Sequence, residues 1–248
     1  MHRVRSRGLL FGICILALTA RPTISFSGAD YREAGWLALR FYGAQRCGAT
    51  GNWALMGHDQ SKGGEVCHTR DGESAGVDLS GGWHDCGDHW KVCFTMGFSA
   101  FTLLKAYEVF PTGFADRYAQ RAPYTESMPA LGGDGIPDVL NEVKVATDYF
   151  IKALPDRNTF YAECGNPDYD HKEWVTSAFQ STRPVDKGGD PRPVVRLTAK
   201  GGASAAQFVA ALALMARLWP EVGSQSYADS CRAAALRGYA YAKKNRNA

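Results

Sequence analysis

The chain has little of what marks a membrane protein or a nucleic-acid-binding protein. Apart from one apolar run near the N-terminus, no segment is expected to be long and apolar enough to span a bilayer. The 28 lysines and arginines nearly balance the 25 aspartates and glutamates, so the formal net charge is only +3. Strand-like alternation is weak and no internal repeat is evident. These absences leave a helical, globular chain of 248 residues, which fits one large domain or two small ones.

The N-terminal segment has the layout of a secretory signal peptide. Three arginines within the first seven residues precede an apolar stretch over residues 9–18, and small residues follow. The alternative is a membrane anchor, but about ten apolar residues fall short of the roughly 20 needed to span a bilayer. We therefore predict a signal peptide over residues 1–27, cleaved after Ala20 or Ser27, and a secreted domain over residues 28–248.

The small positive charge belongs to this predicted signal. It carries four arginines and no acid, so the mature chain has 24 basic and 25 acidic side chains, and 24 − 25 = −1. Nothing in this balance indicates a nucleic-acid partner, and no membrane association is expected once the signal is removed.

Cysteine usage fits export. One of the seven cysteines lies in the predicted signal, which leaves six in the mature chain. Six cysteines in an exported protein allow up to three disulfides and 15 pairings, which sequence alone cannot resolve, and buried free thiols are the alternative. No CxxC pair occurs, so the sequence does not predict a structural zinc site.

Five segments carry the periodicity of helices. They cover residues 30–46, 92–109, 137–154, 203–219 and 225–243. The second is apolar nearly all round, which is typical of a helix buried between neighbours. Polar, Gly- and Pro-rich connections separate the five segments, so the sequence predicts an all-α domain whose loops are free to carry chemistry.

One of these loops, "WHDCGDHW" at residues 83–90, gathers titratable side chains and admits three interpretations. His84, Asp85, Asp88 and His89 offer metal ligands, but the two histidines are five apart rather than four as in helical zinc motifs. The two aspartates alternatively cap the helix expected from residue 92, because anionic side chains favour helix N-termini.

The third interpretation is acid–base chemistry on a sugar. Asp85 and Asp88, three residues apart on a tight turn, can face one water molecule. The flanking Trp83 and Trp90 offer flat apolar faces for a sugar ring. A carboxylate that holds a water beside aromatic platforms is what inverting glycoside hydrolysis needs on its base side.

Longer segments carry a family resemblance. "GVDLSGGWHDCGDHWK" resembles the signature of family nine glycoside hydrolases, which runs like "GVDLSGGWYDAGDHVK". "YREAGWLALRFYGAQRCG", "GDGIPDVLNEVKVATDYFIKAL" and "GNPDYDHKEWVTS" are similar to further family segments, in family order, over roughly residues 29–219. Most members are endoglucanases that cut β-1,4-glucan, such as cellulose, with inversion at the anomeric carbon.

The resemblance implies a role for particular residues. Asp88 matches the general base that activates the nucleophilic water, and Asp85 matches the residue that helps to hold it. His171 and Trp174, in "DHKEW", match the substrate-binding pair: His171 donates to a sugar hydroxyl and Trp174 is a platform.

Trp83 and His84 also fall within the signature and are expected to bind substrate or line the cleft. Cys86 replaces the usual alanine, as a disulfide partner or a small buried neighbour. Family members often carry structural calcium, but no ligands map onto this chain, because Asp134 and Asp138 are read as turn and helix-start residues. No cofactor is therefore predicted.

The family fold is an (α/α)6 barrel, which this chain is expected to contain incompletely. The family's general acid is a glutamate much further along, and neither Glu163 nor Glu173 stands in a matching context or at a spacing that indicates a raised pKa. Two explanations are a partial sequence of a longer enzyme and a real half-barrel, and either leaves apolar helix faces open. The predicted function is an endo-β-1,4-glucanase whose 248-residue chain does not cleave cellulose alone. Alternatives are an exo-acting relative, a non-catalytic glucan-binding half-domain and a metal-dependent hydrolase.

Overall fold

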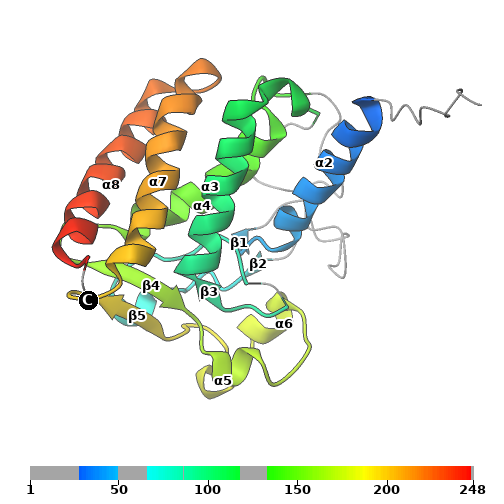
Figure 1. Ribbon diagram of the computed structural model, residues 1–248. Coiled ribbons are helices and arrows are strands. Elements are labelled where there is room, and N and C mark those ends of the chain that lie inside the picture. The colour runs from blue at the N-terminus through cyan, green and yellow to red at the C-terminus, as the bar shows by residue number, and fades with distance from the viewer. Residues whose placement is uncertain (1–27, 50–65, 86, 118–132, 247–248) are drawn as a thin grey trace, which may run out of the picture.

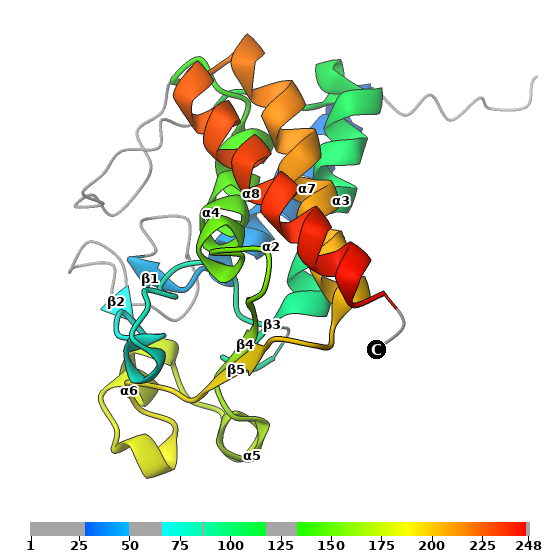
Figure 2. The same ribbon diagram turned by 90° about the vertical axis from the view of Figure 1, so that its left-hand side faces the viewer.

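Five long helices dominate the computed structural model, which describes residues 28–49, 66–85, 87–117 and 133–246. The helices stand side by side, and the strands lie with two short helices at one end of them (Figures 1 and 2). All five predicted helices are confirmed, whereas the predicted signal peptide and Cys86 lie outside the described residues. The long helices are α2 (Gly28–Ala44), α3 (Cys93–Val109), α4 (Asp138–Ala153), α7 (Gly202–Leu218) and α8 (Gln225–Lys244).

Two small antiparallel sheets, which the sequence did not predict, tie distant segments together. β1 (Gly48–Ala49) pairs with β2 (Val66–Cys67). β4 (Phe160–Cys164) lies between β3 (Lys91–Val92) and β5 (Val194–Leu197). Strands of two to five residues are too short to show an alternating pattern, and β4 is buried at four of its five positions. The larger sheet brings the end of the 83–90 loop beside the segment that follows β4.

The core lies between α4, α7 and β4. The rings of Phe150 and Phe208 stack with centroids 3.6 Å apart, and Phe160 meets Phe208 edge-on at 5.6 Å. All three rings are fully buried. Aromatic side chains of this size contribute much of the free energy of folding, because each removes a large apolar area from water.

Helix α7 is the most apolar of the set. The 20-residue stretch Gly202–Glu221 passes a length and hydropathy test for a membrane span, which corrects the expectation that no later segment would do so. However, 50% of its most apolar window is buried within the protein, and α7 packs between α3 and α8 (Figure 1). It behaves as a core helix.

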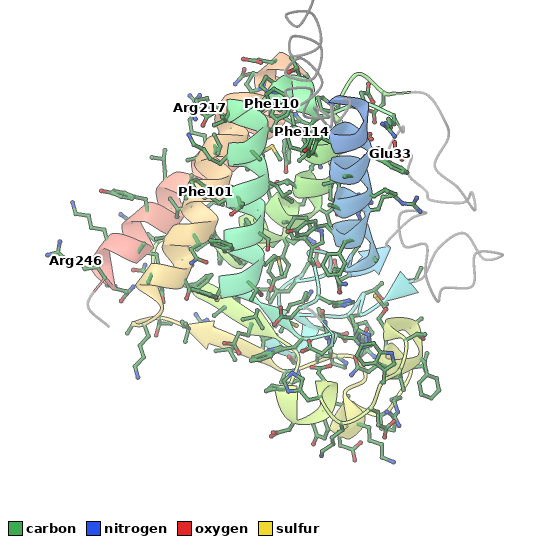
Figure 3. The ribbon with its side chains drawn as sticks, turned by 45° about the vertical axis from the view of Figure 1, so that its right-hand side comes forward. Glu33, Phe101, Phe110, Phe114, Arg217 and Arg246 are labelled. Atoms are coloured by element: carbon green, nitrogen blue, oxygen red, sulfur yellow. The ribbon has the colours of Figure 1, made fainter. Side chains whose placement is uncertain are left out.

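One face of α3 is buried and the other is open. Met96, Ala100 and Leu104 face the core, whereas Phe98 is 60% exposed. Figure 3 shows Phe101 on the outside of this helix. The expectation that α3 is buried on both sides is therefore wrong, and the expectation of open apolar helix faces is confirmed.

Helix α2 shows the same feature. The periodicity of this segment places Tyr31, Leu37 and Phe41 on one face of the helix, and each of these side chains is more than half exposed. The helix instead packs against α4, and Leu39 is the side chain that it buries most fully. Periodicity identified the helix but not the face that contacts α4.

Candidate active site

The 83–90 loop is a tight turn fastened to the end of α2. The backbone N–H of Asp85 donates to the carbonyl of Trp90 across the turn at 2.8 Å, and that of His84 donates to Gln45 at 2.7 Å. Gly87 sits in the left-handed region at φ 87°, which glycine adopts without strain. The turn is thus closed on itself and fixed to a helix end.

Asp88 is held at both carboxylate oxygens. Oδ1 accepts a hydrogen bond from the backbone N–H of Trp90 at 2.8 Å, and Oδ2 lies 2.8 Å from Nε2 of His171. The Asp88 side chain is only 7% exposed whereas that of His171 is 56% exposed, so the imidazole covers the carboxylate on the solvent side. These two predicted site residues, 83 positions apart, are brought together.

Asp85 is half-buried on the same turn, and no described residue hydrogen-bonds to its carboxylate. The helix-capping interpretation does not hold for either aspartate. Helix α3 begins after Val92, and no side chain caps it. Neither carboxylate is therefore engaged at the start of α3.

A cleft of about 600 Å³ opens over Asp88. Its walls are the end of α2, the 83–90 turn and residues 170–177. Trp174, at 89% exposed, stands on one wall with its indole near Gly87. A largely exposed indole beside a carboxylate is an arrangement that suits stacking on a sugar ring.

The short helices α5 (Pro167–Asp170) and α6 (Ser177–Ser181) position this wall. Asn166 caps α5 by accepting a hydrogen bond from the N–H of Asp168, and Thr176 caps α6. His171 is the residue that ends α5. Its reach to Asp88 is therefore set by a capped helical turn.

Trp83 does not lie where the sequence analysis expected. Its indole is 3% exposed, packs against Tyr42 and donates from Nε1 to Glu142 at 2.8 Å. A buried indole has no free face for a sugar, so the expected substrate-binding role of Trp83 is corrected to a structural one. His84 does line the cleft, although its side chain is largely buried.

Two buried ion clusters lie under the turn. Glu142 on α4 pairs with Arg46 at 2.6 Å and accepts the Trp83 N–H. The carboxylate of Asp71 pairs with Lys91 at 2.7 Å and with Arg192 at 2.6 Å. Neither cluster was predicted from the sequence, because the members of each come from distant segments.

The second cluster holds the turn directly. Arg192 donates to the backbone carbonyl of His89, and Lys91 donates to the carbonyls of Leu79 and Gly81 at 2.5 and 3.1 Å. Burial disfavours the charged form of Asp71, but Lys91 and Arg192 outweigh this and lower its pKa well below the usual range. The backbone of the turn is therefore held by Arg192, a buried charged side chain whose own position is set by its ion pair with Asp71.

No described carboxylate stands opposite Asp88 as a proton donor. Burial raises the pKa of Glu163, which the sequence did not lead us to expect, but Glu163 lies on β4 and does not line the cleft. Glu173 does line the cleft, but its ion pair with Arg183 at 2.8 Å lowers its pKa. Neither residue has both the place and the protonation that a general acid needs.

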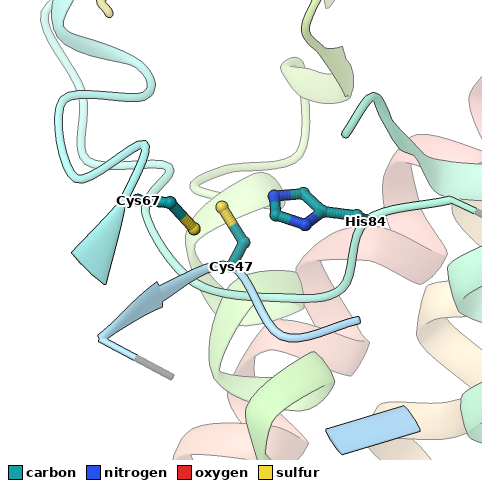
Figure 4. A group of neighbouring side chains, drawn as sticks. All are labelled: Cys47, Cys67 and His84. Carbon is teal, nitrogen blue, oxygen red and sulfur yellow. The ribbon is translucent and has the colours of Figure 1, made fainter. Parts of the chain in front are cut away.

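A group of candidate metal ligands lies beside the turn. The ligand atoms of Cys47, Cys67 and His84 are within 4.8 Å of one another and all three side chains are buried (Figure 4). Two thiols and an imidazole form a donor set typical of tetrahedral zinc. His68 Nε2, on a ring 5.6 Å from that of His84, is buried without a hydrogen-bond partner among the described residues.

Two of the three side chains are in the protonation state that binds metal, whereas a hydrogen bond with Cys47 and burial raise the pKa of Cys67 well above its ordinary value. Burial acts to raise the pKa of Cys47, but a hydrogen bond from Cys67 and the charge of Lys91 outweigh it and lower this pKa well below the ordinary value. Burial lowers the pKa of His84 to about 4, so its imidazole is neutral at physiological pH. A thiolate and a neutral imidazole are the forms that bind metal.

The sequence analysis looked for a CxxC pair and did not find this group, because its three members lie on three separate segments. The other metal interpretation fails, since His84 faces the thiols whereas His89 contacts Gln180 and Asp88 contacts His171. The predicted disulfides are not found among the five described cysteines of the mature chain, all of which are free and buried.

Comparison with known proteins places the chain. The family model described as glycosyl hydrolase family 9 matches residues 31–248. Endoglucanase A of Fibrobacter succinogenes is 34% identical over 245 residues, which cover 96% of this chain and 52% of that protein. Endoglucanase A of Bacillus pumilus is 32% identical over 247 residues, which cover 99% of this chain and 33% of that protein.

Solved structures agree. A cellulase of C. cellulolyticum in complex with cellobiose matches with TM-score 0.66 and 29% identity, over 87% of this chain and 44% of that one. An endoglucanase of the termite Nasutitermes takasagoensis matches with TM-score 0.67 and 27% identity, over 88% and 44%. The fold is thus an incomplete form of the helical (α/α)6 barrel of these structures. The chain belongs to glycosyl hydrolase family 9, and it spans about half or less of the length of these relatives.

Proposed function

We propose that this protein is an endo-β-1,4-glucanase that acts on glucans such as cellulose, and that this chain carries the base side of its active site. The observation that supports this most directly is the cleft over Asp88, with His171 on the carboxylate and Trp174 on the wall. Family membership and relatives that are endoglucanases support the substrate class.

In the proposed reaction Asp88 is the general base. A water above the turn gives a proton to the Asp88 carboxylate while its oxygen attacks the anomeric carbon from the face opposite the leaving group, so the configuration inverts. Asp85, whose carboxylate has no described partner, orients this water. Trp174 holds the sugar ring by stacking, and His171 fixes Asp88 and reaches a sugar hydroxyl.

The leaving oxygen needs a proton from a second carboxyl group, roughly 6.5–9.5 Å from the base. Among the cleft carboxylates that the structure describes, Asp170 is bonded to Gln180 and Glu173 to Arg183. The 248-residue chain is therefore expected to bind a β-1,4-glucan without cleaving it. A glucan-binding half-domain without catalysis is the second candidate, and the same observation favours it.

A substrate that needs no acid separates the two candidates. 2,4-Dinitrophenyl β-cellobioside loses a stable phenolate that leaves with the bonding electrons and takes up no proton. The chain should release this phenolate faster than buffer does, with α-cellobiose as the first product, whereas an Asp88→Asn variant should not. Carboxymethylcellulose should stay intact with both.

Equal phenolate release by the wild-type chain and the Asp88→Asn variant would contradict the base role. If both still bind insoluble cellulose, the glucan-binding candidate takes its place. Cleavage of carboxymethylcellulose by the wild-type chain would show that an acid is present after all.

Secretion is part of the proposal. It is supported by the arginine-rich start and short apolar run of residues 1–27. Expression of residues 1–248 in a host with a secretory pathway should yield a protein in the medium that begins after Ala20 or Ser27. Retention of the intact N-terminus inside the cells would contradict it.

A further inference from the structure

His89 is a cleft residue without an assigned role. It follows Asp88 directly and lines the same cleft. Its ring nitrogen Nδ1 lies 2.8 Å from Oε1 of Gln180, and its backbone carbonyl accepts a hydrogen bond from Arg192. Both the ring and the backbone of this residue are therefore held in place.

The hydrogen bonds behind His89 determine which ring nitrogen carries the proton. Asp170 Oδ1 lies 2.7 Å from Gln180 Nε2, and its Oδ2 accepts from the N–H of Asn166 at 2.9 Å. A carboxylate only accepts, so the amide nitrogen of Gln180 must face Asp170 and the amide oxygen must face His89. His89 must then donate from Nδ1.

This leaves Nε2 of His89 as an acceptor. Above pH 7 a histidine of ordinary or lowered pKa is neutral, and one ring nitrogen then has a free lone pair. No described residue hydrogen-bonds to Nε2, and the His89 ring lines the cleft. Gln180 and Asp170 are 3% and 5% exposed, so solvent does not compete with their hydrogen bonds.

We propose that Nε2 of His89 accepts a hydrogen bond from a hydroxyl of the glucose unit bound beside Asp88, and that Gln180 and Asp170 are positioning residues that fix its tautomer. The proposal rests on the proposed function, because it names a contact to the same substrate. A neutral imidazole with a fixed acceptor suits a sugar, whose hydroxyls are abundant donors. It also adds no charge beside the base.

The tautomer can be measured without any ligand. Long-range ¹H–¹⁵N correlation spectra at pH 8 distinguish the two neutral forms of histidine. We expect His89 to be protonated at Nδ1 in the wild-type chain and to become a mixture in Gln180→Met. Gln225→Met is the matched control: Gln225 lies exposed on α8, bonded to Asp229, and its loss should leave the His89 spectrum unchanged.

The contact is tested by titration with cellotetraose. The Nε2 resonance of His89 should shift on binding, and His89→Phe should bind cellotetraose about tenfold more weakly by calorimetry, the loss expected for one hydrogen bond. Gln180→Met should show a smaller loss and Gln225→Met none.

The outcomes separate this proposal from the one that it rests on. Binding of cellotetraose without a shift at Nε2, or an Nε2–H tautomer in the free wild-type chain, overturns the role of His89 and leaves the glucanase proposal standing. Absence of cellotetraose binding by the wild-type chain overturns the glucanase proposal itself. If His89→Phe does not fold, the titration of the wild-type chain still decides.

Discussion

Replacing Asp71 by asparagine should destabilise the protein strongly. The substitution keeps the size of the side chain but leaves Lys91 and Arg192 without their shared countercharge, and all three side chains are essentially fully buried. Breaking a buried ion pair by removing one partner costs about 3–5 kcal/mol. For a chain of this size each kcal/mol lowers Tm by about 2–4 °C, so the expected loss is about 6–20 °C.

Thermal unfolding followed by circular dichroism at pH 7 measures this loss. The control is Glu73→Gln, which removes an exposed ion pair with Arg70 and should leave Tm unchanged within error. A Tm for Asp71→Asn within about 2 °C of the wild-type value would refute the reasoning, since neighbouring groups or water would then be compensating the two cations.

The pH dependence provides an independent check. The pKa of Asp71 is lower in the folded protein than its value of about 3.9 in the unfolded chain. The unfolded state therefore binds more protons in acid, so this contribution to stability is fully present above about pH 5 and is lost as the pH falls below about 4. The wild-type protein should lose more stability than Asp71→Asn between pH 5 and pH 2.

Three further predictions concern the cleft, the metal ligands and the core. Trp174→Ala should weaken cellotetraose binding about tenfold by calorimetry, and unchanged affinity would exclude stacking. Zinc should raise Tm and a chelator should reverse this, whereas Cys67→Ser should not respond; an equal response would place the metal elsewhere. Phe208→Ala should lower the unfolding free energy by about 3–5 kcal/mol in urea, against about 0.5 kcal/mol or less for the exposed Phe94→Ala, and equal losses would contradict the described core.

The positions of the long helices could be predicted from this sequence, but which face of each helix is exposed could not. The periodicity of residues 30–46 identified α2, but Leu37 and Phe41 on its apolar side lie at the surface. Periodicity reports where a helix can bury side chains, whereas burial depends on which neighbours are present. The strands escaped notice because β3 has only two residues and β4 only five.

The resemblance named residues of the proposed site that lie far apart in the sequence, and the structure shows which of them are close in space. Asp88 and His171 are 83 positions apart, and only the resemblance linked them before the structure placed them 2.8 Å from each other. Trp83 shows the limit of motif-based prediction. Its place in the motif suggested a platform for a sugar ring, whereas its indole is buried and its N–H donates to Glu142. The proximity of Cys47 and Cys67 was not predictable, because no local motif connects two cysteines that are 20 positions apart.

The geometry of the 83–90 turn depends on residues that lie outside its motif. Residues 83–90 bring glycine, two aspartates and two tryptophans, but the turn is oriented by Glu142 on α4 and by Arg192 near β5. A short loop that contains a glycine would otherwise sample many backbone conformations, at a cost of about 1–2 kcal/mol for each residue that is ordered. Buried charges that hold its carbonyls and its indole offset this cost before substrate binds. Placement of Asp88, the proposed base, therefore depends on the described domain as a whole, and substitutions at Asp71 or Glu142, which lie outside the turn, should impair the cleft as well as stability.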